Sequence, residues 1–335
     1  MPLTVVVGGF FGDCGKGKII SHLALRDKVK IVARGGVGPN AGHTVIHEGV
    51  AYRLRQIPSG FIQQGARLLI GPGVLVSPGI LLEEVKLTNT RDRLGLDRQV
   101  GIIEEKHIDE DTKSAYLKKR IGTTGTGCGP AQQERAKRTL KVGQEVDVLK
   151  DFLTDVPLEI NEALEKERNI LLEGTQGTYL SLYHGTYPYV TSKDITASAI
   201  CADVGVGPKR VDDVVVVFKA YVTRVGGGPL ENELSEKEAK RKGWYEIATV
   251  TRRVRRSAPF NFDLARRAIM LNSGTKIALT KLDVVFPKDR AKTKWVELSA
   301  EARKFVARVE EEIKTPVAFI GTGPGSHQII DRTIV

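Results

Sequence analysis

Residues 3–20 read LTVVVGGFFGDCGKGKII, and this segment gives the clearest indication of the fold. The apolar run at 3–7 predicts a buried strand, and Gly12-x-x-x-x-Gly17-Lys18 after it has the spacing of a phosphate-binding P-loop. Such glycines let backbone N–H groups approach a phosphate, and a helix beginning near Lys18 would direct its positive end at the same anion. A plain glycine turn between strand and helix is the alternative. The lysines interleaved with the glycines favour phosphate binding.

Two residues of this loop depart from the usual pattern. Ile19 follows the lysine, where a Ser or Thr hydroxyl normally holds the Mg²⁺ of a nucleotide. Asp13 places a carboxylate inside the loop, where it would repel phosphates unless it coordinates Mg²⁺ or accepts a proton from a substrate. Both roles are open, and either explains why position 19 needs no hydroxyl.

The whole chain of 335 residues is 41% hydrophobic and 27% charged, which is typical of a folded soluble protein. No Pro/Ser linker divides it, so we expect a single α/β domain over 1–335 with helical elaborations near 80–120 and 140–168. No apolar run approaches the roughly 18 residues of a membrane span, and no basic leader precedes the first strand, so we expect a cytoplasmic protein with no membrane partner. Three cysteines without a CxxC pair argue against disulfides and structural zinc.

Apolar β-rich runs recur along the chain and predict the fold class. They lie at 3–7, 67–70, 170–172, 214–217, 277–279 and 317–320. Runs of this kind suit strands buried on both faces, so we predict an α/β fold with a largely parallel central sheet flanked by helices and a P-loop-like nucleotide-binding architecture. Helical patterns lie at 80–87, 110–120, 145–166, 235–242, 262–271 and 301–312. Functional residues are expected in loops at the carboxyl edge of the sheet.

Two further loops carry chemistry. Residues 35–44, GGVGPNAGHT, supply an amide, an imidazole and a hydroxyl, and a donor imidazole at His43 would stabilise charge on a transferring phosphoryl group. Residues 280–283, TKLD, follow a predicted strand. A carboxylate at Asp283 pairs with guanine better than with adenine, and the stem of Lys281 can cover the base. This segment resembles the guanine-reading motif of GTPases.

The basic character of the chain has two explanations. The net charge is +11 with a pI near 9.5, and residues 251–256, TRRVRR, form the densest basic run. Arg253 and Arg255 would share one side of an extended loop and could clamp a small carboxylate. Nucleic-acid contact and a solvated face are the alternatives for this run. Aromatic residues make up 6% of the chain and none is interleaved here, which weakens a stacking platform for single strands.

Taken in order, these motifs resemble the adenylosuccinate synthetase family, whose members join IMP and aspartate at the expense of GTP. The matching segments are 12–18 (GDCGKGK), 40–44 (NAGHT), 121–125 (IGTTG), 173–191, 219–226 (KAYVTRVG), 271–273 (LNS) and 280–283 (TKLD). The resemblance covers almost the whole chain and implies a cytoplasmic, GTP-dependent, C–N bond-forming ligase of purine biosynthesis.

The resemblance also implies a two-step mechanism. Asp13 takes the N1 proton of IMP, whose 6-oxygen attacks the γ-phosphorus of GTP to give 6-phosphoryl-IMP. The amine of aspartate then displaces phosphate at carbon 6, and adenylosuccinate, GDP and phosphate result. The implied catalytic residues are Asp13, Lys16, His43 and Gln176. One Mg²⁺ per subunit is held by Asp13 and the Gly42 carbonyl.

The implied binding residues fall into three groups. Those for GTP are Gly12, Gly15, Gly17, Lys18, Gly42, Thr44, Lys281, Asp283, Gly321, Thr322, Gly323 and Pro324. Those for IMP are Asp13, Lys16, Asn40, Thr123, Thr124, Arg138, Gln176, Thr191 and Arg253. Those for aspartate are Thr251, Arg253 and Arg255. Arg138 would reach the IMP phosphate from the second subunit of a homodimer, and no nucleic-acid partner is implied.

Some positions depart from the family pattern. Cys14 replaces a glutamate, which removes a charge beside the phosphates, and Thr126 stands where many members have arginine. Residues 36–40 carry an extra pair, and the chain is shortened between 93 and 121 and between 138 and 169.

Two other classes of function compete with the synthetase. A GTP-binding switch accounts for the phosphate loop and for residues 280–283, but it leaves residues 173–191 and the arginine loop without a substrate. A basic nucleic-acid-binding protein predicts salt-sensitive binding to duplex or single strand.

Overall fold

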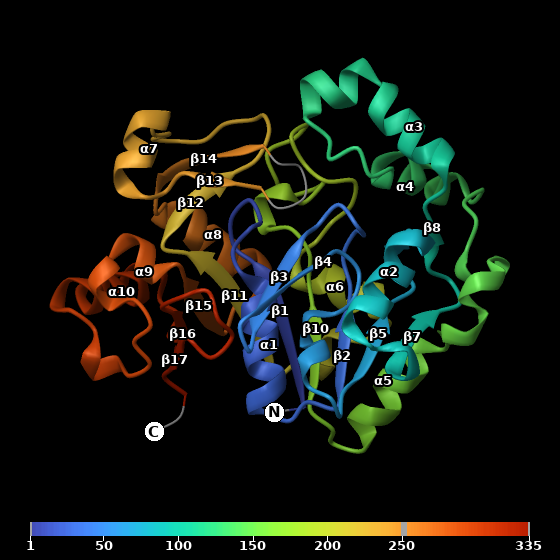
Figure 1. The fold of residues 1–335 in the computed structure, drawn as a ribbon, viewed down its shortest axis with the longest axis horizontal. Coiled ribbons are helices and arrows are strands. Elements are labelled where there is room, and N and C mark those ends of the chain that lie inside the picture. Colours follow the sequence, from blue (N-terminus) through green and yellow to red (C-terminus); the bar gives the residue numbers. More distant parts are fainter. Residues whose placement is uncertain (1, 249–252, 334–335) are drawn as a thin grey trace.

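The predicted strands meet in one ten-stranded sheet (Figure 1). The computed structural model describes residues 2–248 and 253–333. From edge to edge the strands are β17 (Ile329–Asp331), β16 (Val317–Gly321), β15 (Lys276–Thr280), β11 (Asp213–Lys219), β1 (Leu3–Gly8), β10 (Ile170–Glu173), β2 (Ile31–Arg34), β5 (Arg67–Ile70), β7 (Leu94–Asp97) and β9 (Leu153–Thr154). Neighbours pair in parallel except β16 and β17. All six predicted strands are confirmed, as is the α/β class.

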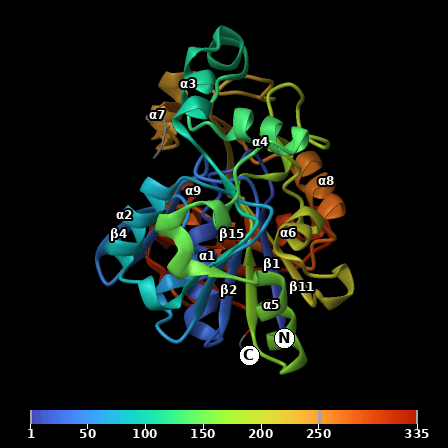
Figure 2. The ribbon, with the colours of Figure 1, turned by 90° about the vertical axis from the view of Figure 1, so that its right-hand side faces the viewer.

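Helices cover both faces of the sheet (Figure 2). Successive side chains of a strand point to opposite faces, so Val5 and Val7 of β1 join one core cluster and Val6 joins the other. Val6 packs in the same cluster as Ile19 and Ile20 of α1 (Lys16–Arg26). The opposite cluster contains residues of α5 (Val156–Glu165), α6 (Ala197–Val204), α8 (Phe262–Asn272) and α10 (Ala300–Ile313).

Four of the predicted helices are confirmed, and two differ in extent. The confirmed helices are α2 (Pro78–Thr88), α7 (Glu236–Lys242), α8 and α10. The pattern at 110–120 divides into α3 (Glu105–Lys113) and a separate π-helical turn (Tyr116–Ile121). Three further helices, α4 (Cys128–Lys137), α6 and α9 (Leu282–Val285), were not predicted.

The helix predicted at 145–166 was wrong over its first part. Short 3₁₀ turns and β9 occupy the segment before α5 begins at Val156. The Asp155 side chain accepts a hydrogen bond of 2.9 Å from the backbone N–H of Leu158, and Pro157 lies in the first turn. These are start signals of a helix, and they fix its beginning after residue 155.

Smaller elements flank one end of the sheet. An antiparallel sheet contains β12 (Tyr221–Arg224), β13 (Glu246–Ile247) and β14 (Val254–Pro259), and β3 (His43–His47) forms a hairpin with β4 (Val50–Leu54). Figure 1 shows β12, β13, β14 and α7 at the upper left and α3 and α4 at the upper right. Within residues 2–248 and 253–333, no helix is long and apolar enough to cross a membrane.

Candidate active site

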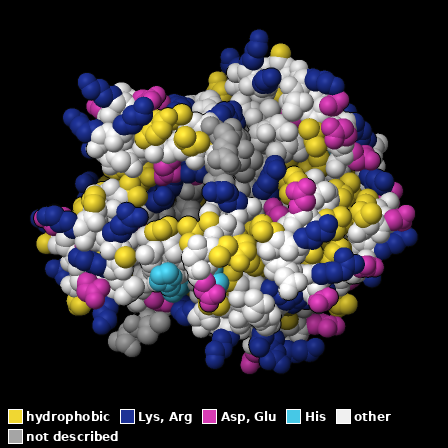
Figure 3. Space-filling model, in the orientation of Figure 1, with side chains coloured by type: hydrophobic (Ala, Val, Ile, Leu, Met, Phe, Trp, Pro, Cys, Tyr) yellow, Lys and Arg dark blue, Asp and Glu magenta, His cyan; other side chains and the backbone are white. Residues whose placement is uncertain are grey.

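A cavity of about 630 Å³ lies at the carboxyl edge of the sheet, where the loops after β1, β2, β10 and β15 meet. Figure 3 shows lysine and arginine side chains near the centre of one face of the molecule. The residues singled out from the sequence that line the cavity are Gly12, Asp13, Gly15, Lys16, Gly17, Lys18, Asn40, Gly42, His43, Thr44, Thr123, Thr124, Gln176, Thr191, Arg253, Arg255, Lys281, Gly323 and Pro324. The structure thus brings together loops that are far apart in the chain.

A few of the expected site residues do not line this cavity. Asp283 is half-buried beside it, Gly321 and Thr322 are buried at the end of β16, and Arg138 is exposed at the end of α4. Thr251 lies outside the described residues.

The phosphate loop and the loop after β10 touch backbone to backbone. Gly15 caps α1 with a φ of 86°, a left-handed conformation that glycine adopts without strain. A Cβ on Gly177 would lie 2.4 Å from the backbone nitrogen of Gly12, so only glycine fits there. This contact places Gln176 against the phosphate loop, and Lys16 Nζ donates a hydrogen bond to the Gln176 carbonyl.

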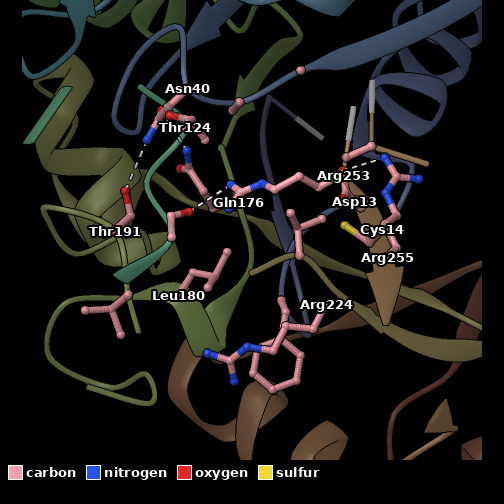
Figure 4. A pocket seen from close by; sticks show the side chains of 18 of the residues that line it. Asp13, Cys14, Asn40, Thr124, Gln176, Leu180, Thr191, Arg224, Arg253 and Arg255 are labelled. Atoms are coloured by element: carbon pink, nitrogen blue, oxygen red, sulfur yellow. Dashed lines mark hydrogen bonds and ion pairs between the residues drawn. The ribbon is translucent and has the colours of Figure 1, made fainter. Parts of the chain in front are cut away.

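Asp13 forms an ion pair with Arg255 on one side of the cavity. Its Oδ1 lies 2.9 Å from Nη2 of Arg255, as Figure 4 shows. The Asp13 side chain is 26% exposed, so the carboxylate remains open to a ligand. Asn40, Gln176 and Thr191 lie on the opposite side of the view in Figure 4. A molecule bound between these three residues and Asp13 would meet a carboxylate on one side and amides and a hydroxyl on the other.

Cys14 points into the protein core. Its side chain is buried in the cluster that contains Val6 and Ile19, and Sγ lies 3.7 Å from Lys16 Nζ. The Cys14 carbonyl accepts a hydrogen bond of 2.7 Å from Thr280 Oγ1. This bond joins the phosphate loop to the segment that carries Lys281 and Asp283.

His43 is held by a buried carboxylate that the sequence did not single out. Its Nδ1 donates a hydrogen bond to Glu173, whose other contacts are Ser59 and, at 3.7 Å, Arg34. Burial and the charge of Arg34 lower the pKa of His43 to about 4. Burial alone would raise the pKa of Glu173, but His43 and Arg34 outweigh it and lower that pKa to about 2. At neutral pH Glu173 is therefore ionised and fixes the orientation of the imidazole.

A hydrogen-bonded chain runs along the side of the cavity expected to bind IMP. Gln176 Nε2 donates to Asn40 Oδ1 at 2.9 Å, and Asn40 Nδ2 donates to Thr191 Oγ1 at 3.3 Å. Arg253 donates to the backbone carbonyls of Gly122 and Thr123 at 2.8 and 3.1 Å. The arginine segment and the 122–124 loop are thereby connected.

Lys18 faces the loop expected to bind guanine. Its Nζ donates to the carbonyls of Gly323 and Gln328 at 2.6 and 2.7 Å. Burial lowers the pKa of Lys18 to about 7, an effect that the nearby Asp283 partly offsets. At neutral pH the charge of Lys18 is therefore sensitive to any anion that binds beside it.

Comparison with known proteins identifies relatives over the whole chain. The family model of adenylosuccinate synthetase matches residues 5–146 and 140–292. The adenylosuccinate synthetases of Archaeoglobus fulgidus and Methanocaldococcus jannaschii are each 53% identical, over 331 and 334 residues, covering 99% of this chain and 98% and 97% of those proteins. The solved structure of fully ligated adenylosuccinate synthetase from Plasmodium falciparum is 26% identical with a TM-score of 0.92, covering 99% of this chain and 100% of that one. A cyanophage S-2L succinoaminodeoxyadenylate synthetase, 24% identical, shares the fold with a TM-score of 0.82 over 98% of this chain and 95% of its own.

Proposed function

This chain belongs to the adenylosuccinate synthetase family, and we propose that the cavity at the carboxyl edge of the sheet is its active site. The chain is a ligase that joins IMP and L-aspartate through a C–N bond at the expense of GTP, in AMP biosynthesis. The observation that carries the residue-level proposal is the meeting of Asp13, Lys16, His43 and Gln176 in one cavity.

Asp13 acts as the general base of the first step. Its carboxylate takes the N1 proton of IMP. The electron pair left on the purine ring makes the 6-oxygen more nucleophilic, and this oxygen attacks the γ-phosphorus of GTP. The P–O bond to GDP breaks, and 6-phosphoryl-IMP forms. The ion pair with Arg255 at 2.9 Å supports this role because it holds the carboxylate in place at the cavity.

Lys16, His43 and Gln176 stabilise the phosphoryl group during transfer. Lys16 brings a positive charge to the loop. His43, oriented by Glu173 through Nδ1, would stabilise the phosphoryl group as an imidazolium, in which Nε2 also carries a proton, and bound phosphates favour that charged form. In the second step the amine of aspartate attacks carbon 6, the C–O bond to phosphate breaks, and the amine loses a proton. Positioning and charge stabilisation of this kind account for most catalysis of phosphoryl transfer.

The oxygen atoms offered by two loops of the cavity suit a bound Mg²⁺ ion. The Asp13 carboxylate and the Gly42 carbonyl line the same cavity, and the described residues contain no group of three or more His, Cys, Asp or Glu side chains that could form a closed cage. Mg²⁺ typically takes one or two protein oxygens together with phosphate oxygens and water. We assign one ion per subunit to Asp13 and Gly42, where it would neutralise charge on the phosphates.

The three substrates occupy different walls of the cavity in this proposal. IMP lies against Asn40, Thr123, Thr124, Gln176, Thr191 and Arg253, and aspartate binds Arg253, Arg255 and Thr251. GTP lies along the phosphate loop, with Gly42 and Thr44, and its base lies near Lys281, Asp283 and residues 321–324. The Lys18 contacts with Gly323 and Gln328 support the last placement because they join the phosphate loop to the base loop.

Assembly and location complete the proposal. Arg138 is exposed and outside its own chain's cavity, which supports its contribution to the IMP phosphate site of a partner in a homodimer. We further propose one catalytic domain over the whole chain, with the segments near 80–120 and 140–168 as elaborations, and a cytoplasmic location.

The assignment is tested by omitting reactants one at a time from a mixture of IMP, GTP, Mg²⁺ and aspartate. We expect GDP to form only when IMP is present, and adenylosuccinate only when aspartate is added. GDP release that does not depend on IMP would contradict the synthetase mechanism and would favour a GTP-binding switch.

A further inference from the structure

A buried cluster of charged and aromatic side chains lies behind Arg255. It consists of Lys219, Tyr221 and Glu246, which come from three different strands, and none of the three lines the cavity. Lys219 is at the end of β11 in the central sheet, while Tyr221 and Glu246 are on β12 and β13 of the small sheet. The cluster therefore sits where the small sheet joins the large one, directly behind an arginine of the proposed aspartate site.

Glu246 is the centre of this cluster. Its oxygens lie 3.0 and 3.2 Å from Lys219 Nζ, and it accepts further hydrogen bonds from the Tyr221 hydroxyl and from Nη1 of Arg255. Lys219 also donates to Thr223 Oγ1 at 2.8 Å. Tyr221 stacks on Trp244 with ring centroids 4.8 Å apart and an interplanar angle of 12°. Glu246 thus has little freedom to move.

The same contacts fix the guanidinium of Arg255. Nη1 is held by Glu246 and Nη2 reaches Asp13, while Nε has no hydrogen-bond partner among the described residues. The Arg255 and Glu246 side chains are each 12% exposed. A planar guanidinium clamped on one side presents its remaining donors in a fixed direction, and that pre-organisation lowers the entropy lost when a carboxylate binds.

Two carboxylates face two cations around Arg255, because Glu246 and Asp13 lie opposite Lys219 and Arg255. Burial opposes ionisation of Glu246, but Lys219, Lys281 and Arg255 hold the pKa of its carboxyl well below the usual range. Glu246 therefore stays negative with Lys219 as a second cation beside it. Because Lys219 compensates part of this charge, Glu246 alone does not neutralise Arg255, and a substrate carboxylate would share Nη2 with Asp13.

We propose that Glu246 is a positioning residue that fixes Arg255 for the aspartate carboxylate and thereby sets the affinity for that substrate. This inference rests on the assignment of Arg255 to the aspartate site under the proposed function. Lys219 and Tyr221 act through Glu246, and none of the three touches a substrate.

The test compares the substrate dependence of Glu246→Gln with that of a matched control. The control is Glu233→Gln, because Glu233 pairs with Arg256, the next residue of β14, which does not line the cavity. We expect Glu246→Gln to raise the KM for aspartate about tenfold, the change that corresponds to about 1.4 kcal/mol. The KM values for IMP and GTP should change less than about threefold, because the proposed function assigns Arg255 to aspartate alone. Glu233→Gln should leave all three unchanged.

Two further variants keep the outcomes distinguishable. Tyr221→Phe removes one hydrogen bond to Glu246 but no charge, so its aspartate KM should rise by a smaller factor. If Glu246→Gln does not fold, Tyr221→Phe alone tests the positioning role of Glu246. An unchanged aspartate KM in a folded variant, or an equal rise in all three KM values, would overturn the positioning role. Arg255→Gln tests the premise: if it leaves the aspartate KM unchanged, the aspartate site itself is misassigned.

Discussion

The proposed function gives Asp13 two roles, as a ligand of the Mg²⁺ beside the phosphates and as the acceptor of a proton from the purine. Its ion pair with Arg255 also shows that the phosphate loop and the arginine segment, 242 residues apart in sequence, share one surface of the cavity. The Asp13 carboxylate can be replaced by the neutral amide of the same shape with little effect on packing.

Asp13→Asn is expected to abolish turnover while leaving the fold intact. Asparagine cannot take a proton, and it is a poorer Mg²⁺ ligand than a carboxylate. The measurements are the steady-state rate and the thermal unfolding midpoint. Activity near that of the wild type would refute proton abstraction by this residue.

Lys18 predicts a pH dependence of nucleotide binding. With its pKa at about 7, much of Lys18 is neutral at pH 8, and a bound triphosphate would favour the ammonium form and raise that pKa. Nucleotide binding should then take up protons above pH 7, so affinity should fall as the pH rises from 7, by at most about tenfold per pH unit. Titration calorimetry in buffers of different ionisation enthalpy measures this uptake.

The control for that measurement is Lys18→Arg, whose guanidinium stays charged throughout this pH range. Its nucleotide affinity should depend less steeply on pH than that of the wild type. Equal slopes in the two proteins would show that another group, on the protein or the nucleotide, takes up the proton.

At the residue scale, sequence reasoning identified cavity-lining residues that belong to local motifs and missed the residues that hold them. Glu173 contacts His43 from 130 positions away, and Glu246 lies outside the arginine run whose side chain it holds. The local sequence does not show which distant residue each of these side chains contacts. The available signal was a charged residue ending an apolar strand, as Arg34 and Glu173 do at the ends of β2 and β10.

At the scale of elements, buried parallel strands were predictable because both faces are apolar and the runs are continuous. Four strands of the sheet were not predicted. The edge strands β9 and β17 lack such runs, and β2 and β7 are four-residue segments whose apolar run ends in Arg34 or is interrupted by Gly95. The helix predicted at 145–166 failed because the cap at Asp155 and the proline after it override the apolar spacing before them. Local start signals therefore decided the boundary more than hydrophobic periodicity did.

Because the phosphate loop and the loop after β10 are in close contact, a larger residue at Gly177 should lower the stability of the protein and its catalytic rate. A Cβ on Gly177 would lie 2.4 Å from both the Gly12 nitrogen and the Phe10 oxygen, which are backbone atoms that cannot turn aside. Gly177→Ala should destabilise the protein by about 1–3 kcal/mol, as overpacking does, and lower the catalytic rate because both loops must shift. Urea denaturation and kcat measure the two effects.

The matched control is Gly207→Ala, because a Cβ at Gly207 would meet nothing within 4 Å. Its stability should stay within about 0.5 kcal/mol of the wild type. Equal urea midpoints for the two variants would contradict the close approach of the two loops.

At the scale of the whole molecule, the position of Arg138 predicts a shared active site. Arg138→Leu and Asp13→Asn should each be inactive alone. In a randomly mixed dimer half the molecules are hybrids with one intact site, so mixing should restore about a quarter of wild-type activity. The assay follows adenylosuccinate formation after subunit exchange has been demonstrated.

A second mixture serves as the control for that experiment. Asp13 and His43 line the cavity of the same chain, so hybrids of Asp13→Asn with His43→Asn contain no intact site and should stay inactive. Recovery in this mixture, or none in the first despite exchange, would count against a contribution of Arg138 in trans.

In the proposed mechanism, the γ-phosphoryl group of GTP moves onto the 6-oxygen of IMP and activates carbon 6. IMP labelled with ¹⁸O at the 6-position tests this directly, because the oxygen that attacks phosphorus must leave with it when aspartate displaces phosphate. We predict one ¹⁸O atom in each inorganic phosphate released by the wild-type protein, measured by mass spectrometry. Unlabelled phosphate formed alongside adenylosuccinate would contradict the account.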